Sequence, residues 1–139
     1  MGSEMCIRDR LLNRPTQEPG FHVLVDIFFR EFPNDLHSLD QIQAKLEKVI
    51  KIAQLNVVKQ DSYAFDEHGL TGFYILSESH LAFHTWPENG YIAIDLFTCS
   101  TRAKTDIAIE AIKKEFIEYN PKKIKIRVVR RGFVYKKEN

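Results

Sequence analysis

Two segments of this chain repeat hydrophobic residues every three or four positions, which is the period of an amphipathic helix. In the first, residues 38–53, Ser38 is followed three positions later by Gln41, a pair typical of a helix N-terminus. The residues expected on its apolar face are Leu39, Ile42, Leu46, Val49 and Ala53. The second segment covers residues 101–119 and ends before Pro121, because proline cannot continue a helix. The residues expected on its inward face are Ile107, Ala108, Ala111, Ile112 and Phe116.

Shorter segments rich in β-branched and aromatic residues predict strands. They are residues 21–29, 56–65, 72–77, 80–86, 91–98 and 123–129. The last of them alternates apolar with basic residues, as expected for a strand with one exposed face. The order of these elements predicts an α+β fold, a two-layer sandwich in which two helices pack on one face of a mainly antiparallel sheet.

The length and composition indicate one domain, which we expect to cover residues 20–135. Residues 1–19 are polar, lack a sustained period and are expected to form a disordered or non-native leader. The formal net charge of +1 gives no reason to expect nucleic acid or a membrane as a partner. Two cysteines make a disulfide framework unexpected and favour a cytoplasmic location.

Most of the candidate chemistry lies in residues 76–99. Ser79 stands between Glu78 and His80, and its hydroxyl group has the carbonyl of Glu78 as its nearest target. Attack there converts the Glu78–Ser79 amide into an ester. Loss of the α-proton of residue 79 then releases Glu78 as a new C-terminus, and hydrolysis of the remaining dehydroalanine leaves a pyruvoyl group, which is an electron sink.

Candidate proton-transfer groups lie near this serine. Side chains alternate along a strand, so His80 and His84 share one face, and either imidazole can act as a base near neutral pH. A hairpin through residues 87–90 returns the strand that ends at Cys99, whose thiol can deliver a proton. Two other readings stay open: Cys99 as a small buried hydrophobic residue, and both histidines as metal ligands with Cys99 and Asp95. The spacing matches no structural zinc pattern, so no metal is expected.

Four motifs carry a resemblance to a known family. They are Gly69-Leu-Thr-Gly72, Leu76-Ser-Glu-Ser-His80, His84-Thr-Trp-Pro-Glu88 and Asp95-Leu-Phe-Thr-Cys99. In these motifs and their spacing the chain resembles the prokaryotic pyruvoyl-dependent S-adenosylmethionine decarboxylase proenzymes, over residues 20–129. The resemblance implies self-cleavage between Glu78 and Ser79, a pyruvoyl cofactor generated from Ser79, and production of the aminopropyl donor for spermidine synthesis.

The resemblance also implies roles for individual side chains. His84 corresponds to the processing base, Thr71 to a hydroxyl that steadies the processing intermediate, and Cys99 to the proton donor in decarboxylation. The positions that correspond to substrate-binding residues are Phe65, Glu88, Asp26 and Leu76. Short members of the family form homodimers with sites at the interface. Ser79 and Cys99 would then come from one subunit, and Thr71, His84, Glu88 and Phe65 from its partner.

The chain departs from the family pattern near the expected substrate pocket. Glu67 replaces a proline, Tyr63 stands where a histidine is frequent, and Ser100 follows the cysteine where glycine is usual. Arginine and ornithine therefore remain alternative substrates, and an uncleaved regulatory subunit without enzymatic activity remains an alternative function. Trp86 and Phe97 are expected in the core. Asp95 lies between apolar residues and needs a pocket or a hydrogen-bonding partner.

Overall fold

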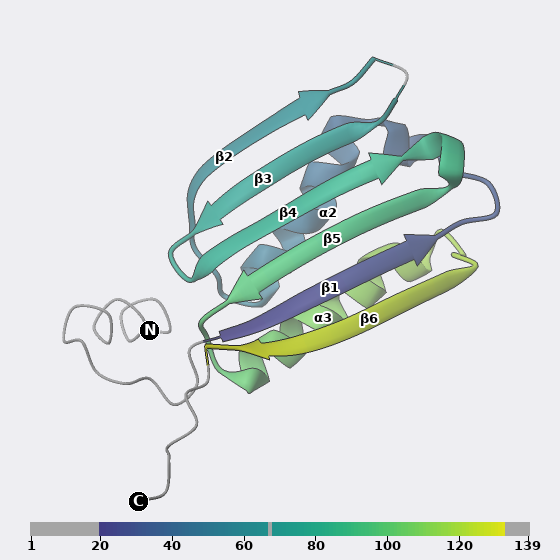
Figure 1. Cartoon of the computed structure of the whole chain (residues 1–139). Helices are drawn as coiled ribbons and strands as arrows, with labels where there is room; N and C mark the ends of the chain where they lie inside the picture. Colours follow the sequence, from purple (N-terminus) through teal and green to yellow (C-terminus); the bar gives the residue numbers. More distant parts are fainter. Residues whose placement is uncertain (1–19, 67, 133–139) are drawn as a thin grey trace, which may run out of the picture.

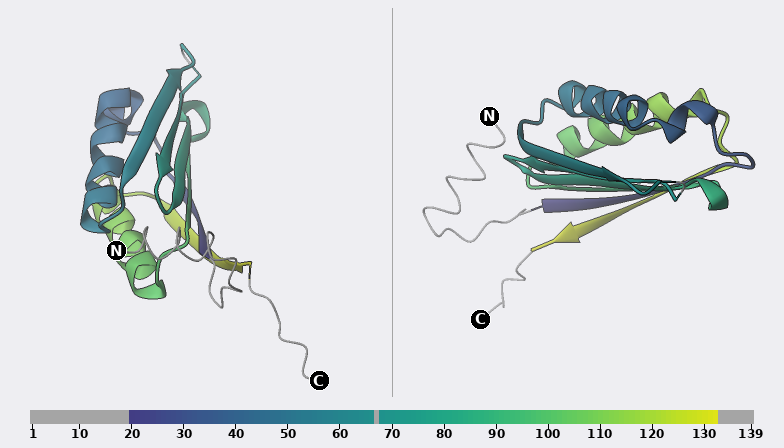
Figure 2. Two further views of the ribbon diagram at one scale, coloured as in Figure 1. Left: turned by 90° about the vertical axis from the view of Figure 1, so that its left-hand side faces the viewer. Right: turned by 90° about the horizontal axis from the view of Figure 1, so that it is seen from above.

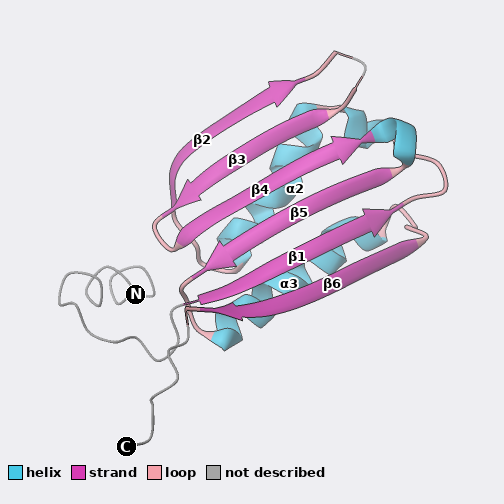
Figure 3. Cartoon of the chain, viewed as in Figure 1, coloured by secondary structure: helices cyan, strands magenta, loops and turns pink. Residues whose placement is uncertain are grey.

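The computed structural model describes residues 20–66 and 68–132. Their elements follow in the order β1 (Gly20–Phe28), η1 (Asn34–His37), α2 (Leu39–Ile52), β2 (Val57–Ala64), β3 (Leu70–Leu76), β4 (Ser79–Trp86), η2 (Pro87–Asn89), β5 (Tyr91–Thr98), α3 (Arg102–Ile117) and β6 (Lys123–Arg131). Figures 1 and 3 show this order, which confirms the predicted succession of strands and helices.

The strands of the described part form one six-stranded sheet in the order β2-β3-β4-β5-β1-β6. All five pairs of neighbouring strands are antiparallel. Three consecutive hairpin-like connections join β2 to β5 (Figure 1). β1 lies between β5 and β6; α2 lies in the connection from β1 to β2, and α3 in the connection from β5 to β6. The sheet therefore places β4 and β5 at its centre, with β3 and β1 beside them.

Both helices cover the same face of the sheet, as Figure 2 shows in the view from above. The core between the two layers contains the inward residues of the strands and the apolar faces of α2 and α3. Along the central strands buried and half-buried residues alternate, so every second side chain belongs to the opposite face. Within the described residues, no helix or strand covers that opposite face (Figure 2). The two-layer α+β sandwich is thus confirmed.

The helix ends follow from their capping residues. The hydroxyl of Ser38 accepts a hydrogen bond from the amide of Gln41, and that of Thr101 accepts one from the amide of Lys104. The expected inward position of Ile107 is wrong, because its side chain is 47% exposed. Ile107 is about 200° round the helix from the buried Thr105, so it lies on the opposite face. Ile109 is buried instead.

The leader at residues 1–19 and the last residues of the predicted domain, 133–135, lie outside the described residues. Among the helices that are described, none has the length and apolar character required to cross a membrane.

Candidate active site

The bond expected to be cleaved lies at the turn between β3 and β4. Ser79 is the first residue of β4, where it faces Leu76 on β3 and Thr98 on β5. Its φ angle is +152°, a value that residues with a side chain rarely adopt. Backbone strain of this kind costs on the order of 1–3 kcal/mol and is frequent at functional sites.

Glu78, on the other side of this bond, is held at both its backbone and its side chain. Its carbonyl oxygen accepts a hydrogen bond of 3.0 Å from the amide of Cys99. Its side chain is 0% exposed, and the two carboxylate oxygens accept hydrogen bonds from the backbone amide and side-chain amide of Asn56, at 3.1 and 3.2 Å. The amide of Cys99 is therefore placed to stabilise negative charge on the Glu78 oxygen during attack by Ser79.

Cys99 directly follows β5, beside the Glu78–Ser79 bond. Its backbone amide donates to the carbonyl of Glu78, so the residue lies next to the expected cleavage point. The role of its thiol as a proton donor stays a prediction.

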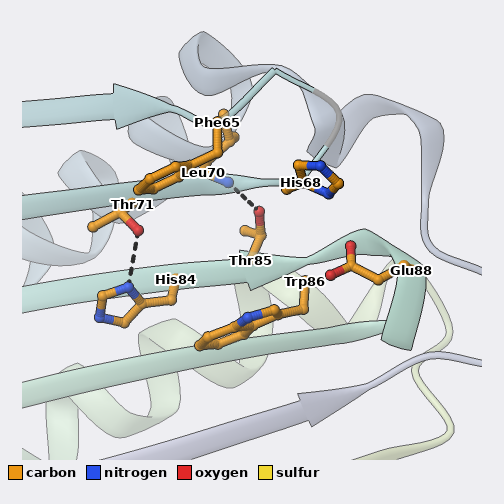
Figure 4. Close-up of a pocket in the computed structure, with 8 residues that line it drawn as sticks. All are labelled: Phe65, His68, Leu70, Thr71, His84, Thr85, Trp86 and Glu88. Atoms are coloured by element: carbon orange, nitrogen blue, oxygen red, sulfur yellow. Dashed lines mark hydrogen bonds between the residues drawn. The ribbon is translucent and has the colours of Figure 1, made fainter.

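Thr71 and His84 lie opposite each other on β3 and β4. The hydroxyl oxygen of Thr71 is 3.0 Å from Nδ1 of His84, as the dashed line in Figure 4 shows. The hydroxyl can donate or accept here according to the tautomer of the ring. The contact fixes the orientation of the imidazole and leaves Nε2 available for proton transfer.

A pocket of about 310 Å³ opens beside this pair, a size suited to a small ligand (Figure 4). It is lined by Phe65, His68, Leu70, Thr71, His84, Thr85, Trp86 and Glu88. The pocket thus brings together two aromatic rings, a carboxylate and the Thr71–His84 pair. Of the residues that the resemblance places at the substrate, Phe65 and Glu88 are both in its wall.

The site residues fall into two groups at opposite ends of β4. Ser79 and His84 are five positions apart on this strand, which corresponds to about 17 Å. The first group contains Glu78, Ser79 and Cys99, and the second contains Thr71, His84 and the pocket. A proton cannot pass directly from Ser79 to His84 of the same chain over this distance.

Two further predicted substrate residues lie outside the pocket wall. Asp26 on β1 accepts a hydrogen bond from the hydroxyl of Tyr91, and burial followed by this hydrogen bond raises the pKa of Tyr91 to about 12. The side chain of Leu76 belongs to the core and is 4% exposed, so only its backbone is available to a ligand.

Asp95 has hydrogen-bonding partners on the uncovered face of the sheet, as its sequence context requires. Its carboxylate accepts a hydrogen bond from Nε2 of His22 and lies 3.9 Å from Nε2 of His80. These three side chains have the residue types of a metal site. However, Nδ1 of His22 lies 3.3 Å from the guanidinium of Arg131, which can only donate. The tautomer that satisfies both contacts has its hydrogen on Nε2, where it leaves no lone pair for a metal.

Sequence reasoning placed Trp86 and Phe97 in the core and gave Asn56 no role. In the structure Trp86 is 36% exposed, stacks on Tyr91 and lines the pocket, whereas Phe97 contacts His22 and His80 on the uncovered face. The signal that could have found Trp86 was the alternation along β4, which puts it on the same face as His84. No local pattern pointed to Asn56.

Comparison with known proteins assigns this fold and site to a family. The sequence model of the S-adenosylmethionine decarboxylase family matches residues 21–132. The S-adenosylmethionine decarboxylase proenzyme of a Sulfurihydrogenibium species is 39% identical over 115 residues, covering 83% of this chain and 84% of the relative. The proenzyme of Persephonella marina is 40% identical over the same length, with the same coverage of each chain.

A solved structure resembles most of the chain. The crystal structure of adenosylmethionine decarboxylase from Aquifex aeolicus superposes with a TM-score of 0.76 at 32% sequence identity, covering 89% of this chain and 99% of the other. Fold, sequence and the family model thus agree. The chain belongs to the S-adenosylmethionine decarboxylase family.

Proposed function

We propose that this chain is a precursor that cleaves itself between Glu78 and Ser79 and then decarboxylates S-adenosylmethionine with the pyruvoyl group formed from Ser79. The observation that carries this proposal is the strained Ser79 next to a carbonyl that is hydrogen-bonded to the amide of Cys99. The relatives' names as decarboxylase proenzymes support it, because a proenzyme requires processing.

The surroundings of the cleavage bond fit the chemistry of the first step. The hydroxyl oxygen of Ser79 attacks the carbonyl carbon of Glu78, and the amide of Cys99 stabilises the negative charge on the oxygen. Collapse of this intermediate breaks the C–N bond and gives an ester. Elimination then releases the carboxylate of Glu78, and hydrolysis of the dehydroalanine releases ammonia.

The pyruvoyl group supplies an electron-withdrawing carbonyl that accepts the electron pair left by carbon dioxide. Residue 79 becomes planar at Cα in this conversion, which removes the tetrahedral centre that makes a φ of +152° costly. Cys99 adjoins the cleavage bond, and the substrate carbon can take a proton from its thiol. The cytoplasmic location expected from the cysteine content stays a prediction.

The active unit in this proposal is a homodimer in which each site combines two chains. His84 lies about 17 Å from Ser79 along β4, too far for direct proton transfer within one chain. The uncovered face of the sheet carries large apolar side chains that a second copy would bury, including Phe28, Phe73, Ile75 and Trp86. Antiparallel packing of two such faces brings the Ser79 end of one sheet towards the His84 end of the other.

The pocket supports an adenosine-containing substrate. Phe65 is 48% exposed and presents an aromatic ring for stacking on adenine, and the carboxylate of Glu88 can accept hydrogen bonds from two ribose hydroxyls. The ring of Trp86 adds a surface that attracts the positive charge of a sulfonium ion. An arginine or ornithine decarboxylase has no ribose to bind and no use for this pairing of groups.

The test combines intact mass with an assay of carbon dioxide release under reducing conditions. We expect fragments that end at Glu78 and begin at a blocked residue 79, and release of carbon dioxide from S-adenosylmethionine but not from arginine or ornithine. Ser79→Ala serves as the control and should stay full-length and inactive. A wild-type chain that stays intact after long incubation would support the regulatory-subunit alternative and reject the proposal.

A further inference from the structure

We propose that Asn56 is a positioning residue for self-cleavage, because it holds the residues that precede the cleavage bond. This inference rests on the proposed function. Asn56 immediately precedes β2, 22 residues before Glu78, and makes three hydrogen bonds to the turn between β3 and β4. Its carbonyl accepts from the amide of Ser77 at 2.9 Å, and its backbone and side-chain amides donate to the two carboxylate oxygens of Glu78.

The Glu78 carboxylate depends on this one residue. Its side chain is 0% exposed, and within the described part of the chain both hydrogen bonds to the carboxylate come from Asn56. A carboxylate that is removed from water needs such donors, because an unpaired buried charge is costly. The side chain of Glu78 is therefore confined to the position that Asn56 defines.

Confinement of this side chain also fixes the peptide group that reacts. Glu78 is held at its carboxylate by Asn56 and at its carbonyl oxygen by the amide of Cys99, 3.0 Å away. Two anchors on one residue restrict rotation of the plane between residues 78 and 79, and they keep Ser79 in its strained conformation. Attack by the Ser79 hydroxyl needs that orientation, since the oxygen must stay aimed at the Cys99 amide as charge develops on it.

The hydrogen-bonded pair of Asn56 and Glu78 can be tested with substitutions that change which side chain donates while keeping the shape of both. Asn56→Ala removes the side-chain donor and keeps the backbone hydrogen bonds. Asn56→Asp keeps the shape but presents a carboxylate to the Glu78 carboxylate. Combining Asn56→Asp with Glu78→Gln reverses the pair, because the glutamine amide can donate to the aspartate while its carbonyl accepts from the amide of residue 56.

The measurement is the rate constant of self-cleavage of the full-length chain, followed by denaturing gel and intact mass. We expect Asn56→Ala to be about tenfold slower than wild type, Asn56→Asp slower still, and the reversed pair to recover to within about threefold. Gln43→Ala is the matched control, because it removes an amide that donates to Ser62 at 3.3 Å, away from the cleavage bond. It should cleave at the wild-type rate.

Folding and cleavage are separated by repeating the substitutions at residues 56 and 78 in chains that also carry Ser79→Ala, which cannot cleave, and measuring thermal unfolding. A positioning role predicts that the reversed pair cleaves faster than Asn56→Asp alone even when its temperature of unfolding is equal to or lower than that of Asn56→Asp. If wild type cleaves and Asn56→Ala cleaves equally fast, or if the reversed pair is no faster than Asn56→Asp alone, the inference is wrong and the proposed function stands. If wild type does not cleave, both are wrong.

Discussion

The hydroxyl of Thr71 lies 3.0 Å from Nδ1 of His84, so one side chain on β3 sets the orientation of a ring on β4. Without this contact the imidazole can rotate about its side-chain bonds, and Nε2 loses its fixed direction. The same geometry places the ring at the edge of the pocket, where Trp86 packs beside it at 5.6 Å between ring centres.

Replacing Thr71 by valine tests this contact at nearly constant volume. We expect Thr71→Val to slow self-cleavage about tenfold, because the ring of His84 loses its hydrogen-bonding partner. Thr71→Ser retains the hydroxyl and should stay within about threefold of wild type. Both rates are measured by intact mass on freshly made precursor. Equal rates for the valine and serine variants would contradict a role of the hydroxyl.

The hydrogen bond from Tyr91 to Asp26 predicts a pH dependence of stability. Burial and this hydrogen bond raise the folded-state pKa of Tyr91 from 10.0 to about 12, so its contribution is complete below pH 10 and is lost as the pH rises through 12. We expect the free energy of unfolding of wild type to exceed that of Tyr91→Phe by about 1 kcal/mol below pH 10.

The difference between the two proteins should shrink as the pH rises from 10 towards 12. Urea unfolding at a series of pH values measures it, and use of the difference cancels the titration of the other groups. A difference that does not change over this range would show that the hydroxyl of Tyr91 is not responsible.

At the scale of single residues, the sequence predicted the residues at the cleavage bond, but not the residue that holds them by hydrogen bonds. Glu78, Ser79 and Cys99 could be placed together because a strand, a short hairpin and its return strand fix which ends meet. Asn56 could not be found, because it reaches Glu78 from 22 residues away and no periodicity encodes that contact. Trp86 was misplaced because its large apolar ring suggested burial, although the alternation along β4 puts it on the same face as His84.

At the scale of the elements, β5 was predicted with its observed bounds, residues 91–98, and the bounds of the other strands were predicted to within two residues. The inward face of α3 was predicted less well. Hydrophobicity alone assigned Ile107 to that face, although this residue is exposed. The connection between β2 and β3 forms part of the pocket wall. Phe65 and His68 within it, and Leu70 at the start of β3, all line the pocket.

Gly69 allows the connection between β2 and β3 to pack closely against the end of β4. Its φ is +105°, and a Cβ atom there would lie closer to the carbonyl oxygen of Thr85 than van der Waals contact allows. We therefore expect Gly69→Ala to lower the free energy of unfolding by about 2–5 kcal/mol, measured in urea, from backbone strain and overpacking together. Lys59→Ala, at an exposed position on β2, should change it by less than about 0.5 kcal/mol. A similar small effect of Gly69→Ala would mean that the connection can move away from Thr85.

At the scale of the whole molecule, the sheet has one face covered by helices and one that no described element covers. The apolar residues on the second face and the separation of Ser79 from His84 are the two observations behind the proposed two-chain active unit. Sequence patterns could predict the two layers, but they could not predict that two chains pair through the second face. The alternation along a strand is the same whether water or a partner covers the face.

Mixing two inactive variants tests the composite site directly. Ser79→Ala keeps His84 and His84→Ala keeps Ser79, so neither should cleave in its own homodimer. In a mixed dimer one site contains an intact Ser79 and an intact His84. With equal amounts and random pairing, half of the dimers are mixed, and we expect cleavage of about half of the His84→Ala chains and none of the Ser79→Ala chains. Co-expression with two different tags and intact mass of each chain measure this. The control replaces Ser79→Ala by a chain that carries both substitutions, which should give no cleavage. If purified mixed dimers also leave every His84→Ala chain intact, His84 does not act across the interface, and the base for Ser79 has to be sought within its own chain, where His80 is the adjacent candidate.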